Sequence, residues 1–186
     1  MTTPSADGTP EPVVEPDDKD WTWTLRQQCP ECGFDAGSVA AADIATLVTA
    51  CTDPWPEVLQ RPDAGRRPRA ATWSPLEYAC HVRDVCRLFE QRLQLMLTED
   101  SPTFTNWDQD ETAVRERYGE QQPAVVARER AEAAAGLAGA YARVPGDAWG
   151  RTGLRSDGSE FTVLTLGQYG LHDLAHHLWD VGIRVP

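Results

Sequence analysis

The feature that most constrains the fold is a long amphipathic helix that the sequence predicts from Ser74 onwards. Ser74 and Glu77 form a capping box, and Pro75 occupies the first helical position. Apolar residues then recur at helical spacing as far as about Leu97, namely Val82, Val85, Cys86, Phe89, Leu93 and Met96. Such a face must be buried against other helices, so the pattern favours a helical bundle.

Three further segments carry helical patterns. They are residues 38–59, interrupted at Asp53-Pro54-Trp55-Pro56, the alanine-rich residues 123–143, and residues 165–182. Ser38 is the expected N-cap of the first of these helices. Between the helices we expect loops, a short helix near 111–118, and a hairpin or extended stretch within 146–163. Residues 38–186 are therefore predicted to form an all-α four-helix bundle.

The N-terminal part of the chain has a different character. Residues 1–20 hold six acidic residues against Lys19 and few large apolar groups, so we expect a disordered acidic tail. Residues 21–37 are expected to form an irregular lead-in that contains the turn Cys29-Pro30-Glu31-Cys32-Gly33.

Charge and hydropathy limit the partners and the location. The net charge of -12 would repel a phosphate backbone, so nucleic acid is not an expected partner. No apolar run approaches the roughly 18 residues of a membrane span, and the N-terminus has no signal-peptide pattern. The sequence predicts a cytoplasmic protein that takes a small-molecule substrate, and a homodimer is compatible with it.

The histidines are the strongest candidates for chemistry. Three of the four lie in the segment His172-Asp173-Leu174-Ala175-His176-His177. Residues four apart share one helix face, so His172 and His176 can point two imidazoles at one ion. His177 is rotated by about 100° from His176 and is expected to face elsewhere. His81, at the edge of the apolar face of its own helix, is the third candidate.

Three neutral imidazoles suit a divalent transition metal and leave coordination positions open. Zinc is the first choice, with nickel or iron as alternatives. The spacing is that of the zinc-protease motif His-Glu-x-x-His, but Asp173 replaces the glutamate, so no general base is assigned. The other reading of each histidine is a hydrogen-bonded core residue. Candidates for hydrogen bonds to metal-bound histidines are Glu77, Asp84, Asp173 and Asp180.

Two segments are similar to a known family. Trp73-Ser74-Pro75-Leu76-Glu77-Tyr78-Ala79-Cys80-His81-Val82 resembles the opening motif of the DinB/YfiT-like superfamily, and residues 172–177 resemble its C-terminal His-x-x-x-His helix. The resemblance covers roughly residues 38–182. It implies an up-down four-helix bundle with a metal site at His81, His172 and His176. In some members it also implies thiol-dependent transferase or isomerase chemistry with mycothiol or bacillithiol, and others are described as metal-dependent hydrolases.

The resemblance and the residues together give three functional hypotheses. The first is a metal-dependent thiol S-transferase or isomerase. Its co-substrate would be mycothiol, because one lysine against sixteen arginines is typical of a high-GC bacterium. The second is a metal-dependent hydrolase that activates water at the same site. The third is a non-catalytic metal-binding helical module.

Other residues carry weaker signals. The Cys29/Cys32 turn is compatible with a second, structural zinc site, with a redox pair, or with a plain reduced turn, since a single C-x-x-C supplies only two ligands. It is not part of the family pattern. Trp107 lies in a polar loop and Arg155 in the loop before the last helix, and both are candidates for the lining of a substrate pocket.

Overall fold

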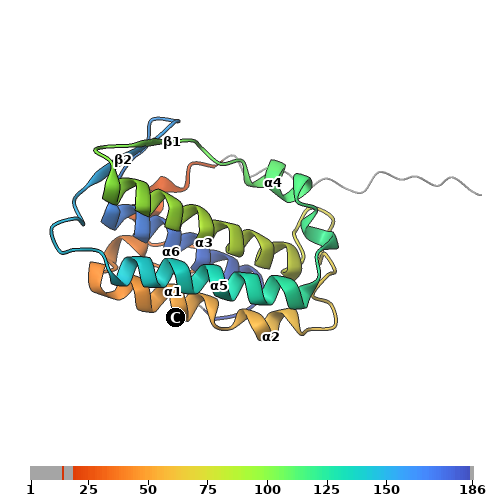
Figure 1. The fold of residues 1–186 in the computed structure, drawn as a ribbon. Coiled ribbons are helices and arrows are strands. Elements are labelled where there is room, and N and C mark those ends of the chain that lie inside the picture. Colours follow the sequence, from red (N-terminus) through yellow and green to blue (C-terminus); the bar gives the residue numbers. More distant parts are fainter. Residues whose placement is uncertain (1–13, 15–18, 185–186) are drawn as a thin grey trace, which may run out of the picture.

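The computed structural model describes Val14 and residues 19–184. The expected acidic tail therefore lies outside the described residues, apart from Val14, Lys19 and Asp20. The main helices are α1 (Ile44–Thr52) with its short continuation α2 (Trp55–Leu59), α3 (Pro75–Thr98), α5 (Pro123–Ala142) and α6 (Val163–Asp180). They pack into a four-helix bundle (Figure 1), which confirms the predicted all-α class.

The order of the helices around the bundle differs from their order in the chain. α5 packs against both α3 and α1, and α6 packs against the same two helices. α3 and α5 both end near the small sheet, where α6 begins, so the chain between α3 and α5 crosses the length of the bundle (Figure 1). This crossover carries α4 (Gln109–Arg115) and the 3-10 turn η4 (Tyr118–Glu120).

The start of α3 is built as the sequence predicts. The Ser74 hydroxyl accepts a hydrogen bond from the Glu77 backbone N–H at 3.2 Å, and the Glu77 carboxylate accepts one from the Ser74 N–H at 2.8 Å. Arg67 also forms an ion pair with this carboxylate. This box fixes the first turn of α3, and His81 follows one turn later.

The start of α1 differs from the expectation. The Ser38 hydroxyl donates to the Asp35 carbonyl at 2.8 Å and caps no α-helix. Two 3-10 turns, η2 (Ala36–Ser38) and η3 (Ala41–Asp43), come first, and α1 begins only at Ile44. The Ser38 hydroxyl is thus used in a local hydrogen bond to the backbone and is not the cap of a helix. Such local hydrogen bonds compete with helix formation, which is why serine is frequent in turns.

The predicted hairpin is present and leads into α6. Strands β2 (Thr152–Arg155) and β3 (Glu160–Thr162) are antiparallel, and β1 (Thr103–Phe104) pairs in parallel with β2. Thr162 then caps α6. A Cβ on Gly170 would lie 2.7 Å from Phe89 of α3, so this glycine permits close contact between α6 and α3.

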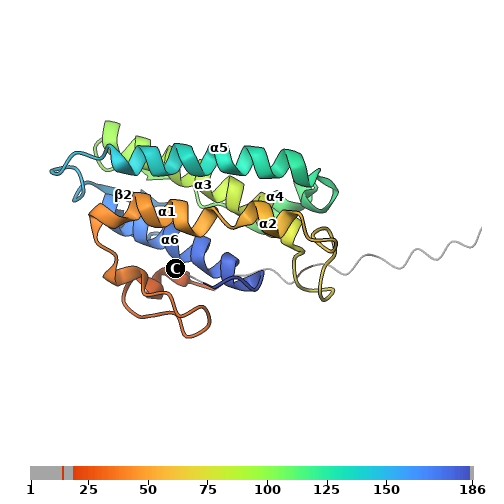
Figure 2. The ribbon, with the colours of Figure 1, turned by 90° about the horizontal axis from the view of Figure 1, so that it is seen from below.

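The lead-in packs on α6, on the side of the bundle away from α5 (Figure 2). It contains the 3-10 helix η1 (Trp21–Leu25) and the Cys29–Cys32 turn, and η1 and η2 both contact α6. Within residues 19–184, no helix has the length and apolar character needed to cross a bilayer.

Candidate metal centres

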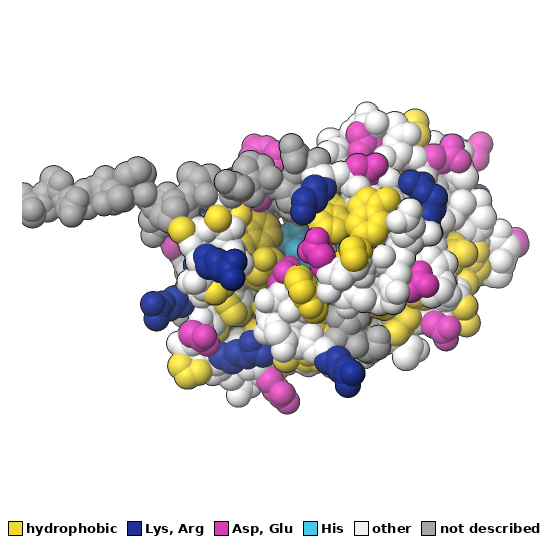
Figure 3. Space-filling model, turned by 180° about the vertical axis from the view of Figure 1, so that it is seen from behind, with side chains coloured by type: hydrophobic (Ala, Val, Ile, Leu, Met, Phe, Trp, Pro, Cys, Tyr) yellow, Lys and Arg dark blue, Asp and Glu magenta, His cyan; other side chains and the backbone are white. Residues whose placement is uncertain are grey.

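A cleft of about 780 Å³ is bounded by α3, α6, the lead-in and the loops around residues 106–110 and 155–159. Histidine side chains are visible at the bottom of a hollow, between hydrophobic and acidic side chains (Figure 3). One face of α6 lines this cleft, with the residues Tyr169, His172, Asp173, His176, His177 and Asp180. Two separate groups of potential metal ligands lie there.

The first is the His-Asp-His group, formed by His81 of α3 with Asp173 and His177 of α6. His81 Nε2 lies 3.3 Å and His177 Nε2 lies 3.6 Å from the same Asp173 oxygen, Oδ1. Two ligands at ~2.1 Å from a tetrahedral ion are about 3.4 Å apart. The two spacings therefore fit ligands of a common ion, and the shorter one also allows a hydrogen bond between His81 and Asp173.

A neighbouring carboxylate orients His177. His177 Nδ1 donates to Asp180 Oδ2 at 2.8 Å, which leaves Nε2 with its lone pair directed towards Asp173. This pattern, in which the second ring nitrogen binds a carboxylate, is common in metal-bound histidines. The His81 ring is fully buried, and its Nδ1 has no hydrogen-bond partner among the described residues.

The electrostatics of the His-Asp-His group favour metal-binding protonation states at His81 and Asp173. Burial lowers the pKa of His81, so its imidazole is neutral near pH 7. Loss of water around Asp173 would by itself raise its pKa, but the neighbouring His81 and His177 hold that pKa at about 2. The group therefore combines a neutral His81 imidazole with an ionised Asp173 carboxylate.

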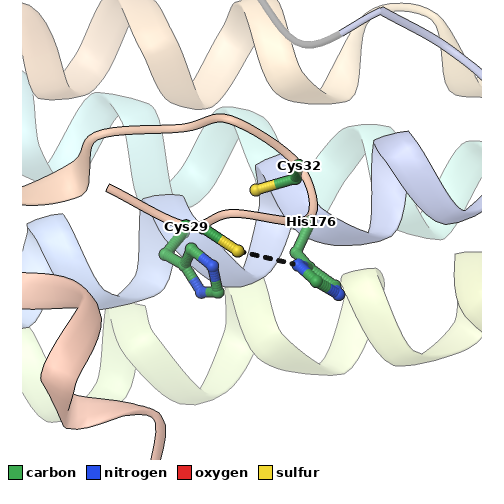
Figure 4. A group of neighbouring side chains, drawn as sticks. Cys29, Cys32 and His176 are labelled. Atoms are coloured by element: carbon green, nitrogen blue, oxygen red, sulfur yellow. Dashed lines mark hydrogen bonds between the residues drawn. The ribbon is translucent and has the colours of Figure 1, made fainter. Parts of the chain in front are cut away.

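The second is the Cys-Cys-His-His group, formed by Cys29, Cys32, His172 and His176. Their ligand atoms all lie within 4.8 Å of one another. Cys29 Sγ lies 3.8 Å from His176 Nδ1, and the lead-in places its turn directly over α6 (Figure 4). Trp21 of η1 packs on both histidine rings, with centroids 5.4 Å from His172 and 5.1 Å from His176.

The surroundings of the Cys-Cys-His-His group favour neutral imidazoles, which can bind a metal ion. His172 Nε2 is buried and has no hydrogen-bond partner among the described residues. Burial, assisted by His176, lowers the pKa of His172 to about 4, and burial likewise lowers the pKa of His176. Burial raises the pKa of the Cys32 thiol to about 11. Metal coordination is the usual means by which a thiol in such surroundings becomes a thiolate.

The three histidines that the sequence grouped together occur in two different groups of neighbouring potential ligands. His172 and His176 do lie together, but their other neighbours are Cys29 and Cys32. His81 lies with two residues that the sequence reasoning did not treat as ligands. His177 is indeed turned away from His176, and it faces His81, with ring centroids 4.6 Å apart. Asp173 and His177 have the same four-residue spacing as His172 and His176. This spacing is the feature of the sequence that could have identified them as a second pair of potential ligands.

Both pocket candidates line the cleft. The Trp107 ring stacks on His81, with centroids 5.3 Å apart and 13° between the planes. The Arg155 guanidinium is held by Asp157 at 2.7 Å and lies over the Phe161 and Tyr169 rings.

A further arginine lies at the same end of the cleft. Arg92 of α3 also lines the cleft, is 4 % exposed, and its Nε has no partner among the described residues. Burial and the nearby Arg155 lower the pKa of Arg92 to about 10, so both guanidinium groups are charged at neutral pH.

The remaining cysteines are not placed for chemistry. Cys51, Cys80 and Cys86 are fully buried in the core, and burial raises the pKa of each thiol to about 12. A thiol with so high a pKa is protonated at neutral pH and is a poor nucleophile.

Comparisons with known proteins agree with the fold. The DinB superfamily model matches residues 39–181. Among solved structures, the chain is similar to YfiT from Bacillus subtilis, described as a probable metal-dependent hydrolase with an unusual four-helix bundle topology. The match has a TM-score of 0.63 and 17 % identity, and covers 76 % of this chain and 83 % of YfiT. A comparison with curated proteins finds no match.

Proposed function

The chain belongs to the DinB superfamily, and from this premise we propose that it is a metal-dependent transferase that joins a low-molecular-weight thiol, such as mycothiol, to a small electrophile. The observation that carries the proposal is the His-Asp-His group. It offers three ligands at the side of a large cleft, and three protein ligands with open positions are typical of catalytic metal sites.

The donor set fits a divalent transition metal. Two imidazoles and one carboxylate occur in both zinc and non-haem iron enzymes. The spacings of 3.3 Å and 3.6 Å around Asp173 Oδ1 fit a common ion, and Asp180 orients the His177 ring. We propose His81, Asp173 and His177 as the ligands of the catalytic ion. The three-histidine set predicted from the sequence differs from this one in two ligands, and metal analysis of variants separates the two assignments.

A bound ion would supply a lowered pKa for a coordinated thiol. The protein residues would do the rest. Asp180 keeps the lone pair of His177 Nε2 directed into the group. Trp107 covers His81 on the cleft side and keeps water from that ring. Trp21 and Tyr78 add aromatic walls on which a substrate can pack.

The thiol has to come from outside the chain. Three of the five cysteines are buried in the core with raised pKa values, and the other two lie in the Cys-Cys-His-His group. The cleft of about 780 Å³ is towards the upper end of the ~300–1,000 Å³ found for small-molecule sites. This volume supports a thiol co-substrate bound together with an electrophile.

The arginine end of the cleft points to the class of electrophile. Arg92 and Arg155 bring two guanidinium groups to one end of the cleft, and Arg92 Nε has no protein partner among the described residues. A planar carboxylate matches the fork of a guanidinium. We therefore propose that the electrophile carries a carboxylate. Arg92 holds this carboxylate while the reactive carbon faces the His-Asp-His group, and Arg155, whose guanidinium is bound by Asp157, adds positive charge at the same end of the cleft.

The test is a screen of small electrophiles, with and without carboxylates, with metal-loaded protein and either mycothiol or no thiol. We expect consumption that requires the thiol and that is lost in His81→Ala. Arg92→Met should raise KM for carboxylate substrates and leave neutral ones unchanged. No thiol-dependent consumption of any electrophile by the metal-loaded protein would refute the proposal.

A hydrolase is the second candidate. The same open positions would take water, and the donor set of two histidines and one carboxylate is that of several zinc hydrolases. The thiol-free arm of the same screen, extended to esters and amides, distinguishes the two: hydrolysis at equal rates with and without mycothiol would favour the hydrolase.

A further inference from the structure

Four residues of metal-binding type lie together where the lead-in meets α6. Cys29 and Cys32 come from the lead-in, and His172 and His176 come from two successive turns of α6. Cys29 and His176 are separated by 147 residues in the chain, yet Sγ and Nδ1 lie 3.8 Å apart. In Figure 4, Cys29 and His176 point towards one another and Cys32 lies above them.

The backbone of the turn is shaped to direct both sulfur atoms to one side. The Gly33 N–H donates to the Cys29 carbonyl at 2.9 Å, and the Cys29 N–H donates to the Phe34 carbonyl at 3.0 Å. Gly33 has φ of +75°, a conformation that glycine adopts without strain. A tight C-x-x-C-G turn of this shape is a common source of two thiolate ligands in structural zinc sites.

The spacing and the surroundings fit zinc. With Zn–S at ~2.3 Å and Zn–N at ~2.1 Å, sulfur and nitrogen ligands of a tetrahedral ion lie about 3.6 Å apart, close to the 3.8 Å between Cys29 and His176. Cys29 is 1 % exposed and His172 is 3 % exposed. His172 Nε2 is buried without a hydrogen-bond partner among the described residues, and an ion bound through this nitrogen would satisfy it.

We propose that Cys29, Cys32, His172 and His176 bind one zinc ion as a closed, four-coordinate structural site, separate from the His-Asp-His group. Four protein ligands leave no position for substrate, which is the distinction between structural and catalytic zinc sites. The role of this ion is to fasten the lead-in to α6. The site stands on its own geometry and does not depend on the reaction proposed above.

The ligands of the two groups alternate along α6. His172 and His176 form one row, and Asp173 and His177 form the next row, rotated by about 100° around the helix. The lead-in contributes Trp21, which lines the cleft and packs on the His172 and His176 rings. Zinc at this site would therefore hold one wall of the cleft in place.

Cobalt substitution tests the site without relying on activity. Tetrahedral Co²⁺ with thiolate ligands gives intense visible bands and an ultraviolet charge-transfer band that histidine and carboxylate ligands do not give. We expect the charge-transfer band in the wild type and in His81→Ala/His177→Ala, and its loss in Cys29→Ser/Cys32→Ser. Cys51→Ala, which removes a core thiol, is the matched control and should keep the band.

A second measurement uses the wild-type protein, in case the double cysteine variant does not fold. Zinc should shield Cys29 and Cys32 from a maleimide reagent, and a strong chelator should expose two thiols and make the chain sensitive to trypsin at Arg26. If the wild type binds no zinc, or if Cys29→Ser/Cys32→Ser keeps the charge-transfer band, the proposed site is wrong. Reaction of both thiols at equal rates with and without chelator would also overturn it.

Discussion

Asp180 should control the affinity of the His-Asp-His group although it is not itself a proposed ligand. Its Oδ2 accepts a hydrogen bond from His177 Nδ1 at 2.8 Å, and the two side chains are only 19 % and 16 % exposed. This bond fixes the tautomer of His177 and raises the basicity of the nitrogen that faces Asp173. Asp180→Asn keeps the size and a neutral acceptor, whereas Asp180→Ala removes the acceptor.

The expected loss of metal affinity depends on whether the substituted side chain can still accept the hydrogen bond from His177. Loss of such an outer hydrogen bond typically lowers metal affinity by about 10–100-fold. At about 1.4 kcal/mol per tenfold, this is roughly 1.4–2.8 kcal/mol of binding free energy. We expect Asp180→Asn near the lower limit, because its amide oxygen can still accept, and Asp180→Ala near the upper limit.

The assay is a zinc titration of metal-free protein against a chromophoric competitor. Glu31→Gln is the matched control, because Glu31 lies 3.6 Å from His176 of the other group and is 48 % exposed. It should leave the affinity of the His-Asp-His group unchanged. In a His177→Ala background, Asp180→Asn should add nothing, since no ring remains to be oriented. Unchanged affinity in both Asp180 variants, or an equal loss in the His177→Ala background, would refute this reasoning.

Three further outcomes concern stability. Gly170→Ala on α6 would place its Cβ 2.7 Å from Phe89, so urea denaturation should show a loss of about 1–3 kcal/mol. On α5, the three atoms nearest to a Cβ at Gly136 belong to the movable carboxylate of Glu90, so Gly136→Ala should gain up to about 1 kcal/mol from helix propensity. Equal effects of the two substitutions would contradict the packing argument. Burial would raise the pKa of Glu77, but hydrogen bonds from Arg67 and Ser74 lower it. The ionised Glu77 carboxylate therefore stabilises the fold at neutral pH, and this contribution is lost as the pH falls through the lowered pKa. Glu77→Gln should therefore be less stable than the wild type at pH 7, and the two unfolding free energies should converge in acid; a constant difference would be inconsistent with the ion pair.

Local signals in the sequence predicted most of the fold. The capping box at Ser74 and the apolar face after it placed α3 to within a residue, because all the interactions that start this helix are local. The same type of reasoning misplaced the start of α1, because Ser38 bonds to Asp35 and not to a helical N–H. The order of the helices around the bundle depends on how the long connection after α3 packs. The spacing of apolar residues within each helix carries no information about that packing.

The candidate site was partly accessible to the same reasoning. The four-residue spacing placed His172 and His176 on one face of a helix, and the structure has them together. A count restricted to histidines did not consider Asp173 and His177 as a pair, although they have the same four-residue spacing. The approach of Cys29 to α6 joins residues 147 apart. Only the packing of the lead-in decides that contact, so no local pattern could give it.

The most direct test of the account is the metal content of the purified wild type and three variants, measured by elemental analysis. If the two groups bind separate ions, the wild type holds two per chain. His81→Ala/His177→Ala and Cys29→Ser/Cys32→Ser should each lose one, and His172→Ala should lose only the ion that depends on the cysteines. If His81→Ala/His177→Ala and His172→Ala instead lose the same ion while the cysteine variant loses none, the three histidines share one site and the division of ligands proposed here is wrong.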